Sequence, residues 1–177
     1  MCIRDRFQSG REFGGGGGVS IYCNDQLTVN CIDNLCYVTD YIECCTVKIK
    51  INSRTIFVIA VYRPPGGSLD TFNENMIEIL NDSSLRNCEI VVLGDFNINL
   101  INYHDSNINV RNFVLNMFSH HYISVISKPT RFPCGDQHGV PSLLDHTWYN
   151  RTGANESGIL IFDNTDHLPT FVIMKCG

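Results

Sequence analysis

The sequence contains no long uninterrupted apolar run, and this absence excludes several classes of protein. No segment approaches the roughly 20 apolar residues that a membrane-spanning helix requires. The N-terminal residues also lack the apolar core of a secretory signal peptide. We therefore expect neither secretion nor a membrane as a partner.

Paired cysteine motifs are also absent, although the chain has nine cysteines. None of them forms the CxxC spacing that is typical of a zinc site. Most lie in apolar segments such as residues 41–47, where a reduced cysteine behaves as a small hydrophobic residue. This pattern favours a reducing compartment, so we expect an intracellular location in the nucleus or the cytoplasm.

Positive charge is scarce, because 13 lysines and arginines face 18 aspartates and glutamates and leave a net charge of −5. Such a balance argues against a broad electrostatic surface for nucleic acid. It does not exclude a nuclease, since a metal-dependent active site itself needs carboxylates. Local basic residues such as Arg63, Lys128 and Arg131 could hold phosphates beside those carboxylates.

The length of 177 residues and the apolar content of 44% predict one domain with a substantial core. Strand patterns outnumber helical ones, and the sequence therefore predicts an α/β (α+β) fold in which a two-sheet sandwich is flanked by helices. A capping box of Thr71 and Glu74 is expected to open the first helix, and apolar spacing predicts a second helix over residues 109–120. The expected strands cover a hairpin at 19–30 and residues 45–51, 56–61, 89–94, 122–126, 142–149, 157–162 and 169–174.

The first 13 residues show neither helical nor alternating periodicity, and we expect them to be an irregular, non-native leader in front of the domain. Five glycines follow, Gly14 to Gly18. A glycine run can cradle a phosphate, but no Gly-Lys-Ser/Thr follows it and the next segment has the pattern of a strand. A flexible turn is the better interpretation.

Polar residues recur where the expected strands end. Each pair alone is typical of a turn or a cap, but their repetition after, within or before four of the expected strands predicts one shared site. Asp95 and Asn97 are one residue apart, so in an extended backbone their side chains would point to the same side. The pairs are Tyr62 with Arg63, Asp95 with Asn97, Asp145 with His146, and Asp166 with His167.

Five ordered segments carry a family resemblance. They are Tyr62-Arg63-Pro64-Pro65, Gly94-Asp95-Phe96-Asn97, Pro129-Thr130-Arg131, Leu144-Asp145-His146 and Thr165-Asp166-His167-Leu168-Pro169. Together they resemble the endonuclease/exonuclease/phosphatase superfamily, and more narrowly the endonuclease domain of non-LTR retrotransposons. The glycine run before Val19-Ser20-Ile21-Tyr22 is similar to that family as well, and the resemblance covers about residues 11–174.

The resemblance implies a divalent-metal-dependent phosphodiesterase that uses Mg²⁺ or Mn²⁺ and nicks DNA to leave a 3′-hydroxyl. Asp95 would orient and deprotonate the attacking water, while Asn97 would fix the geometry of attack by hydrogen bonding. Asp145 would hold a charged His167 against a phosphate oxygen. The implied catalytic residues are Tyr62, Asp95, Asn97, Asp145 and His167, the implied substrate-binding residues are Arg63, Thr130 and Arg131, and the implied metal ligands are Asp166 and Asp95.

The sequence departs from the family pattern in two places. Thr165 stands where the family usually has serine, which keeps the hydroxyl. Family members also carry an asparagine and a metal-binding glutamate upstream of the glycine segment, for which this sequence has no room. We therefore expect residues 14–177 to be a partial, N-terminally truncated domain that is weakly active or inactive.

Three alternatives remain at the level of sequence. An inactive fragment would keep the motifs without turnover. A phosphatase or lipid phosphodiesterase of the same superfamily would share the catalytic set and differ in its loops. A serine hydrolase is poorly supported, because Ser142, Asp145 and His146 crowd into one strand and no G-x-S-x-G elbow exists.

Overall fold

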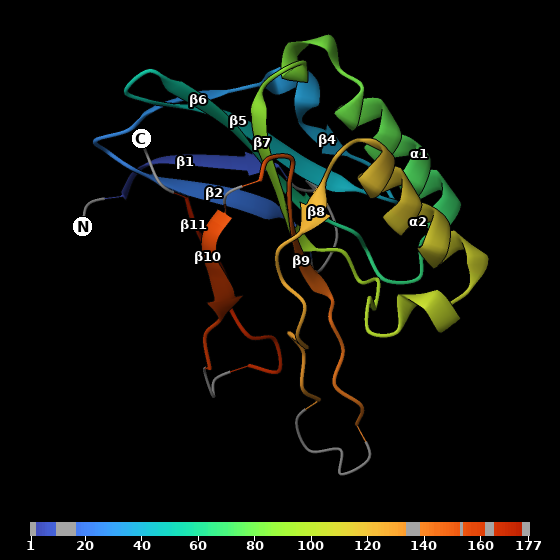
Figure 1. The fold of residues 1–177 in the computed structure, drawn as a ribbon. Helices are drawn as coiled ribbons and strands as arrows, with labels where there is room; N and C mark the ends of the chain where they lie inside the picture. The colour runs from blue at the N-terminus through green and yellow to red at the C-terminus, as the bar shows by residue number, and fades with distance from the viewer. Residues whose placement is uncertain (1–2, 10–16, 134–138, 153, 162–164, 175–177) are drawn as a thin grey trace.

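The computed structural model describes residues 3–9, 17–133, 139–152, 154–161 and 165–174 of the chain. Its elements form layers around a seven-stranded sheet (Figure 1). Helices α1 (Leu69–Leu80) and α2 (Ile108–Ser119) lie together on one face of that sheet. Two antiparallel strand pairs, β1–β2 and β10–β11, lie on the opposite face.

The central sheet has the strand order β3-β5-β6-β7-β9-β8, and β4 pairs with β5 at its side. Only the central pair β6–β7 is parallel among the described pairs, and α1 lies in the connection between these two strands. The strands are β1 (Ile3–Ser9), β2 (Val19–Asn24), β3 (Thr28–Cys31), β4 (Tyr37–Val38), β5 (Glu43–Ile51), β6 (Arg54–Tyr62), β7 (Glu89–Asp95), β8 (Ile123–Ser124), β9 (Asp145–Tyr149), β10 (Ala154–Ile159) and β11 (Thr170–Met174).

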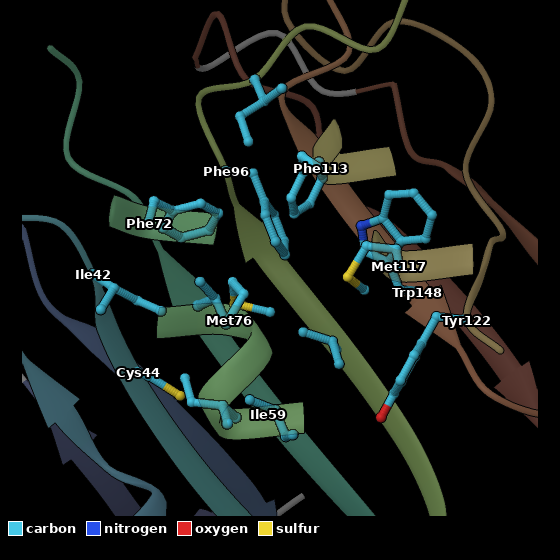
Figure 2. Packing of buried hydrophobic residues seen from close by; sticks show 14 of the residues in the cluster. Ile42, Cys44, Ile59, Phe72, Met76, Phe96, Phe113, Met117, Tyr122 and Trp148 are labelled. Carbon is cyan, nitrogen blue, oxygen red and sulfur yellow. The ribbon is translucent and has the colours of Figure 1, made fainter. Parts of the chain in front are cut away.

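The main core fills the space between the helices and the sheet (Figure 2). α1 contributes Phe72 and Met76, and α2 contributes Phe113, because residues at helical spacing share one face. The rings of Phe96 and Trp148 meet them from the sheet side, and Phe113 lies 5.7 Å from Phe96 and 5.8 Å from Trp148 between centroids. Burial of each such side chain contributes about 1.5–3 kcal/mol, so this cluster dominates the stability of the domain.

Two smaller apolar clusters cover the opposite face of the sheet. Val19 of β2 packs with Cys45 and Ala60, whereas Met174 of β11 packs against a cluster around Val91. Leu93 is half-buried and touches both clusters. The two strand pairs therefore cover neighbouring parts of one face, with the end of β7 between them.

The predicted mixed fold of packed sheets with outer helices is confirmed, but several local expectations are wrong, and two of them concern the N-terminal strands. Residues 3–9 are not irregular, because they form β1, in which Phe7 pairs with Ile21 of β2 and packs on the second face of the sheet. Residues 10–13 of the expected leader lie outside the described residues. Residues 19–30 do not pair as a hairpin either, since β2 pairs with β1 and β3 pairs with β5. Both errors concern the strand with which β2 or β3 pairs. Local periodicity does not specify strand pairing.

The first helix begins earlier than its sequence suggested. Its N-cap is Ser68, whose hydroxyl accepts the N–H of Thr71 at 3.2 Å. Thr71 is therefore in the first turn and does not open a capping box with Glu74. In the described part of the chain, neither α1 nor α2 has the length and apolar character that crossing a bilayer would require.

Gly94 permits the close approach of β6 and β7 just before the polar end of β7. Its φ of +140° is a conformation that L side chains rarely adopt, and a Cβ there would lie 1.9 Å from the carbonyl oxygen of Val61. That oxygen belongs to a buried strand and cannot move aside without breaking the sheet. A side chain at position 94 is therefore incompatible with this pairing.

We expect Gly94→Ala to lower the free energy of unfolding by about 3 kcal/mol or more, because strain and a backbone clash act together. Gly66→Ala is the matched control, since Gly66 also has a positive φ, of +82°, but a Cβ there meets nothing within 4 Å. The control should cost only about 1 kcal/mol of backbone strain. Urea unfolding of the two variants measures the difference, and equal losses would contradict the clash.

Candidate active site

A row of four polar side chains crosses the central sheet at the ends of its strands. Glu43 of β5 is the register partner of Tyr62, Tyr62 is the partner of Asp95, and Asp95 is the partner of Asp145. Residues that pair directly across strands point to the same face. We call these four residues the polar row, and it lies on the face that is covered by the two strand pairs.

Asp95 and Asn97 are joined by direct hydrogen bonds. The backbone N–H of Asn97 donates to Asp95 Oδ1 at 3.0 Å, and its side-chain Nδ2 donates to Asp95 Oδ2 at 3.2 Å. We expected an extended backbone to place the two side chains on the same side. This expectation is wrong, because β7 ends at Asp95 and Asn97 has a φ of +49°. The local contact is an Asx-type turn, which positions the Asp95 carboxylate.

Burial raises the pKa of the Asp95 carboxyl above its ordinary value. The backbone N–H of Asn97 opposes this rise, whereas the neighbouring Asp145 adds to it. A carboxylate with a raised pKa is a stronger base than an exposed one. The environment of Asp95 therefore suits a group that accepts a proton.

His167 approaches the polar row from the segment before β11. Its Nδ1 lies 2.9 Å from Asp145 Oδ2, and both side chains are half-buried. Thr165 orients the same residue, because its hydroxyl accepts the backbone N–H of His167 at 2.9 Å. The hydroxyl, which the serine usual in the family would also provide, thus fixes the backbone at His167.

Asp95, Asp145 and His167 form a compact cluster, in which one potential ligand atom from each lies within 4.8 Å of the others. They line a hollow of about 300 Å³ together with Leu93, Thr165 and residues 168–170. Three residues that are distant in sequence thus meet in one concave, half-buried place. This cluster is where the structure concentrates groups capable of acid–base or metal chemistry.

Thr130 and Arg63 do not face this hollow, in contrast to their expected contact with substrate. Thr130 is fully buried, and its hydroxyl accepts the backbone N–H groups of Leu144 at 3.1 Å and Asp145 at 3.0 Å. Arg63 is 8% exposed, and its guanidinium donates to the carbonyl oxygens of Asn97 and Gly67. Both side chains are thus engaged by backbone groups of neighbouring segments.

Asp166 and Arg131 pair with each other beside the site. Arg131 Nε donates to Asp166 Oδ2 at 2.8 Å, and this hydrogen bond lowers the pKa of the Asp166 carboxyl. Asp166 is not a member of the cluster that contains Asp95. The backbone of Arg131 bridges Ser142 and His167, so this arginine stands at the border of the hollow.

One polar residue expected in the shared site, His146, lies elsewhere, and sequence reasoning missed a second buried polar residue, Glu43. His146 faces the main core, where its ring stacks on Phe96 with centroids 4.6 Å apart and its Nε2 lies 2.8 Å from the carbonyl oxygen of Ile98. Glu43 is fully buried at one end of the polar row. A glutamate inside an apolar strand pattern was the available signal for Glu43, but only the register relates it to Tyr62.

Comparison with known proteins identifies the family. The sequence model of the family described as endonuclease-reverse transcriptase matches residues 56–171, more than half of the chain. The chain belongs to the endonuclease-reverse transcriptase family. The matched segment runs from β6 to β11 and includes Tyr62, Asp95, Asp145 and His167. No curated protein sequence matches the chain significantly.

Solved structures show the same fold at low sequence identity. The endonuclease domain of TRAS1, a telomere-specific non-LTR retrotransposon, has a TM-score of 0.76 and 14% identity, with 97% of this chain and 80% of that domain covered. An endonuclease/exonuclease/phosphatase family protein from Leptotrichia buccalis has a TM-score of 0.67 and 16% identity, with coverages of 97% and 72%. A 3′ phosphatase from Neisseria bound to a product DNA hairpin has a TM-score of 0.63 and 14% identity, with coverages of 90% and 75%.

These matches confirm the resemblance inferred from the five sequence segments. Membership in the endonuclease-reverse transcriptase family and the endonuclease/exonuclease/phosphatase fold agree with the layers described above. Low identity limits the structural likeness to the fold itself.

We expect Thr130→Val to lower the free energy of unfolding by about 2 kcal/mol or more, because it leaves two buried N–H groups without an acceptor. Thr130→Ser keeps the hydroxyl and loses one methyl group, and should cost about 1 kcal/mol. Chemical denaturation of both variants tests this. A valine variant as stable as the serine variant would show that the two backbone N–H groups find other partners.

Burial lowers the pKa of His146 from 6.5 to about 4. The folded state therefore favours the neutral ring of His146. The contribution of this ring to the free energy of unfolding is complete above pH 6.5 and is lost as the pH falls toward 4. This difference in pKa corresponds to roughly 3 kcal/mol. Unfolding measured between pH 7 and pH 4 should show a shallower loss of stability for His146→Gln, whereas His104→Gln, at an exposed position, should follow the wild type.

Proposed function

We propose that the chain is a divalent-metal-dependent DNA endonuclease that nicks one strand and leaves a 3′-hydroxyl. The observation that carries this proposal is the half-buried cluster of Asp95, Asp145 and His167 in a hollow at the ends of β7 and β9. A base, a charged histidine and its partner carboxylate are the groups that phosphodiester hydrolysis needs. Family membership supports the same class of reaction.

The residues of the cluster fit a divalent cation of the magnesium type. Mg²⁺ prefers oxygen ligands and keeps several waters, so one or two carboxylates suffice. Asp95 offers such a carboxylate, and Asp145 lies beside it. Asp166 would join them only after leaving its ion pair with Arg131. The cation would supply positive charge that offsets the charge developing on the phosphate during cleavage.

Asp95 acts as the base in this proposal. Its carboxylate takes a proton from water as the water oxygen attacks phosphorus, and the bond between phosphorus and the 3′-oxygen breaks on the opposite side. The leaving 3′-oxygen takes a proton from solvent, so the products are a 3′-hydroxyl and a 5′-phosphate. Asn97 holds the carboxylate in place through its two hydrogen bonds, which makes it a positioning residue.

His167 and Tyr62 stabilise the phosphate. A protonated His167 donates to a non-bridging phosphate oxygen from Nε2, since its Nδ1 is engaged by Asp145. Asp145 thereby fixes the orientation of the ring. Tyr62 is next to Asp95 in the polar row, and its hydroxyl can donate a hydrogen bond to the same phosphate.

DNA is the proposed substrate, although the chain is acidic overall. Arg131, which pairs with Asp166, lies beside the hollow through its contact with His167 and could exchange this partner for a DNA phosphate. The similarity to a retrotransposon endonuclease domain supports a DNA substrate. The similarity to a 3′ phosphatase bound to a DNA hairpin favours a second candidate, removal of a 3′-phosphate from DNA by the same cluster.

Supercoiled plasmid incubated with Mg²⁺ or Mn²⁺ tests the proposed nicking, and a chelator should abolish it. We expect Asp95→Asn and His167→Ala each to reduce the nicking rate at least about 100-fold, because each removes a group that acts on the reacting phosphate. Asp105→Asn, on an exposed short helical turn, should nick like the wild type. The wild-type rate should also fall at acidic pH as Asp95 becomes protonated, since the base must be deprotonated.

Undiminished nicking by Asp95→Asn and His167→Ala would assign the activity to a different site or to a contaminating enzyme. A 3′-phosphorylated oligonucleotide tests the second candidate in the same reactions. Release of phosphate without any nicking would favour the phosphatase over the endonuclease.

A further inference from the structure

The two ends of the polar row make the same kind of contact with the covering layer. At one end Asp145 binds the ring of His167, which precedes β11. At the other end Glu43 binds the backbone of Gly18, which precedes β2, at 2.5 Å from the N–H nitrogen to Oε2. Tyr62 and Asp95 lie between these two carboxylates. Each border of the site is thus attached to the sheet by one acidic side chain.

The contact of Glu43 is built into the fold. Its side chain is fully buried, and a buried carboxylate is stable only where hydrogen-bond donors surround it. Gly17 and Gly18 have φ values of +99° and +107°, so the backbone bends around the carboxylate as only glycine readily allows. A Cβ at Gly17 would lie 2.7 Å from Glu43 Oε1. The backbone at these two glycines thus directs the N–H of Gly18 at the carboxylate.

The segment held in this way borders the site. Val19, the next residue, is buried in the cluster against which Tyr62 packs. Gly17 and Gly18 themselves are exposed, and without side chains they leave room for another backbone to approach. The flexible turn expected from the glycine run is therefore held in one shape at these two residues, beside a residue proposed to bind phosphate.

We propose that Glu43 is a positioning residue for strand cleavage, which holds Gly17 and Gly18 as the border of the substrate groove opposite His167. The inference rests on the proposed endonuclease function. Glu43 does not touch the reacting phosphate and acts through the glycine backbone and Tyr62. A DNA strand that reaches the hollow would pass over the two glycines, and their fixed position would align the scissile phosphate with Asp95.

Steady-state nicking of an oligonucleotide duplex by Glu43→Gln tests the proposal, because glutamine keeps the size of the side chain and removes its charge. We expect kcat to fall about 10- to 100-fold through misalignment, while KM changes by no more than about twofold. Gly17→Ala should cause a similar loss, since its methyl group would collide with the carboxylate. The double variant should be no slower than the slower single variant, because both changes break one contact.

Glu74→Gln is the matched control, since Glu74 is an exposed glutamate of α1, the helix that packs on the opposite face of the sheet. Exchange of the Gly18 amide proton, followed by NMR, reports the contact independently of activity and should accelerate in Glu43→Gln but not in Glu74→Gln. Gly17→Ala changes an exposed position, so it supplies the same kinetic test if the buried substitution does not fold.

The outcomes separate this inference from the proposed function. Faster Gly18 exchange with wild-type kcat in both Glu43→Gln and Gly17→Ala would leave Glu43 a purely structural role and overturn the inference alone. Additive losses in the double variant would also overturn it, because they would show two independent effects. A wild-type chain that nicks no DNA with Mg²⁺ or Mn²⁺ overturns the endonuclease function, and the inference with it.

Discussion

The pairing register between β5, β6, β7 and β9 determines which residues share the site. Because side chains alternate along a strand, one register brings Tyr62, Asp95 and Asp145 to the same face and the same level. If one strand slipped by one residue against its neighbour, its member of the polar row would point into the apolar core and a core residue would point to the site. The main core prevents such a slip, because Val92 and Trp148 are buried between sheet and helices only in the observed register.

Neighbouring residues on β9 show how sharply the two faces differ. Asp145 lies on the face with the hollow and binds His167, whereas the next residue, His146, is buried against Phe96 on the helix side. The same sheet thus supports a polar site and an aromatic core one residue apart. The buried hydroxyl of Thr130 accepts the N–H groups of Leu144 and Asp145. It thereby fixes the backbone at the point where β9 begins to present one residue to each face.

Sequence patterns located the strands that carry the site but not the contacts among their ends. The apolar runs at 56–61 and 89–94 are β6 and β7, and Asp95 follows them as expected because strand termination is a local property. The inward positions of Thr130 and Arg63 were not predictable, since they depend on backbone groups distant in sequence. Glu43 was missed for the same reason, because its relation to Tyr62 exists only through strand pairing. Local periodicity also could not reveal that β2 pairs with residues 3–9.

The covering layer consists of two separate strand pairs, and this division affects how the site can adapt. In a continuous sheet, backbone hydrogen bonds would fix the distance between the two borders at a multiple of the strand spacing. Here β1–β2 and β10–β11 each pair only within themselves among the described strands, and each is attached to the central sheet by its own apolar contacts. The separation of the two strand pairs is therefore set by two independent attachments. Changes in the segment before β2 or in the segment before β11 can therefore shift one strand pair while the other pair and the helix-side core keep their packing.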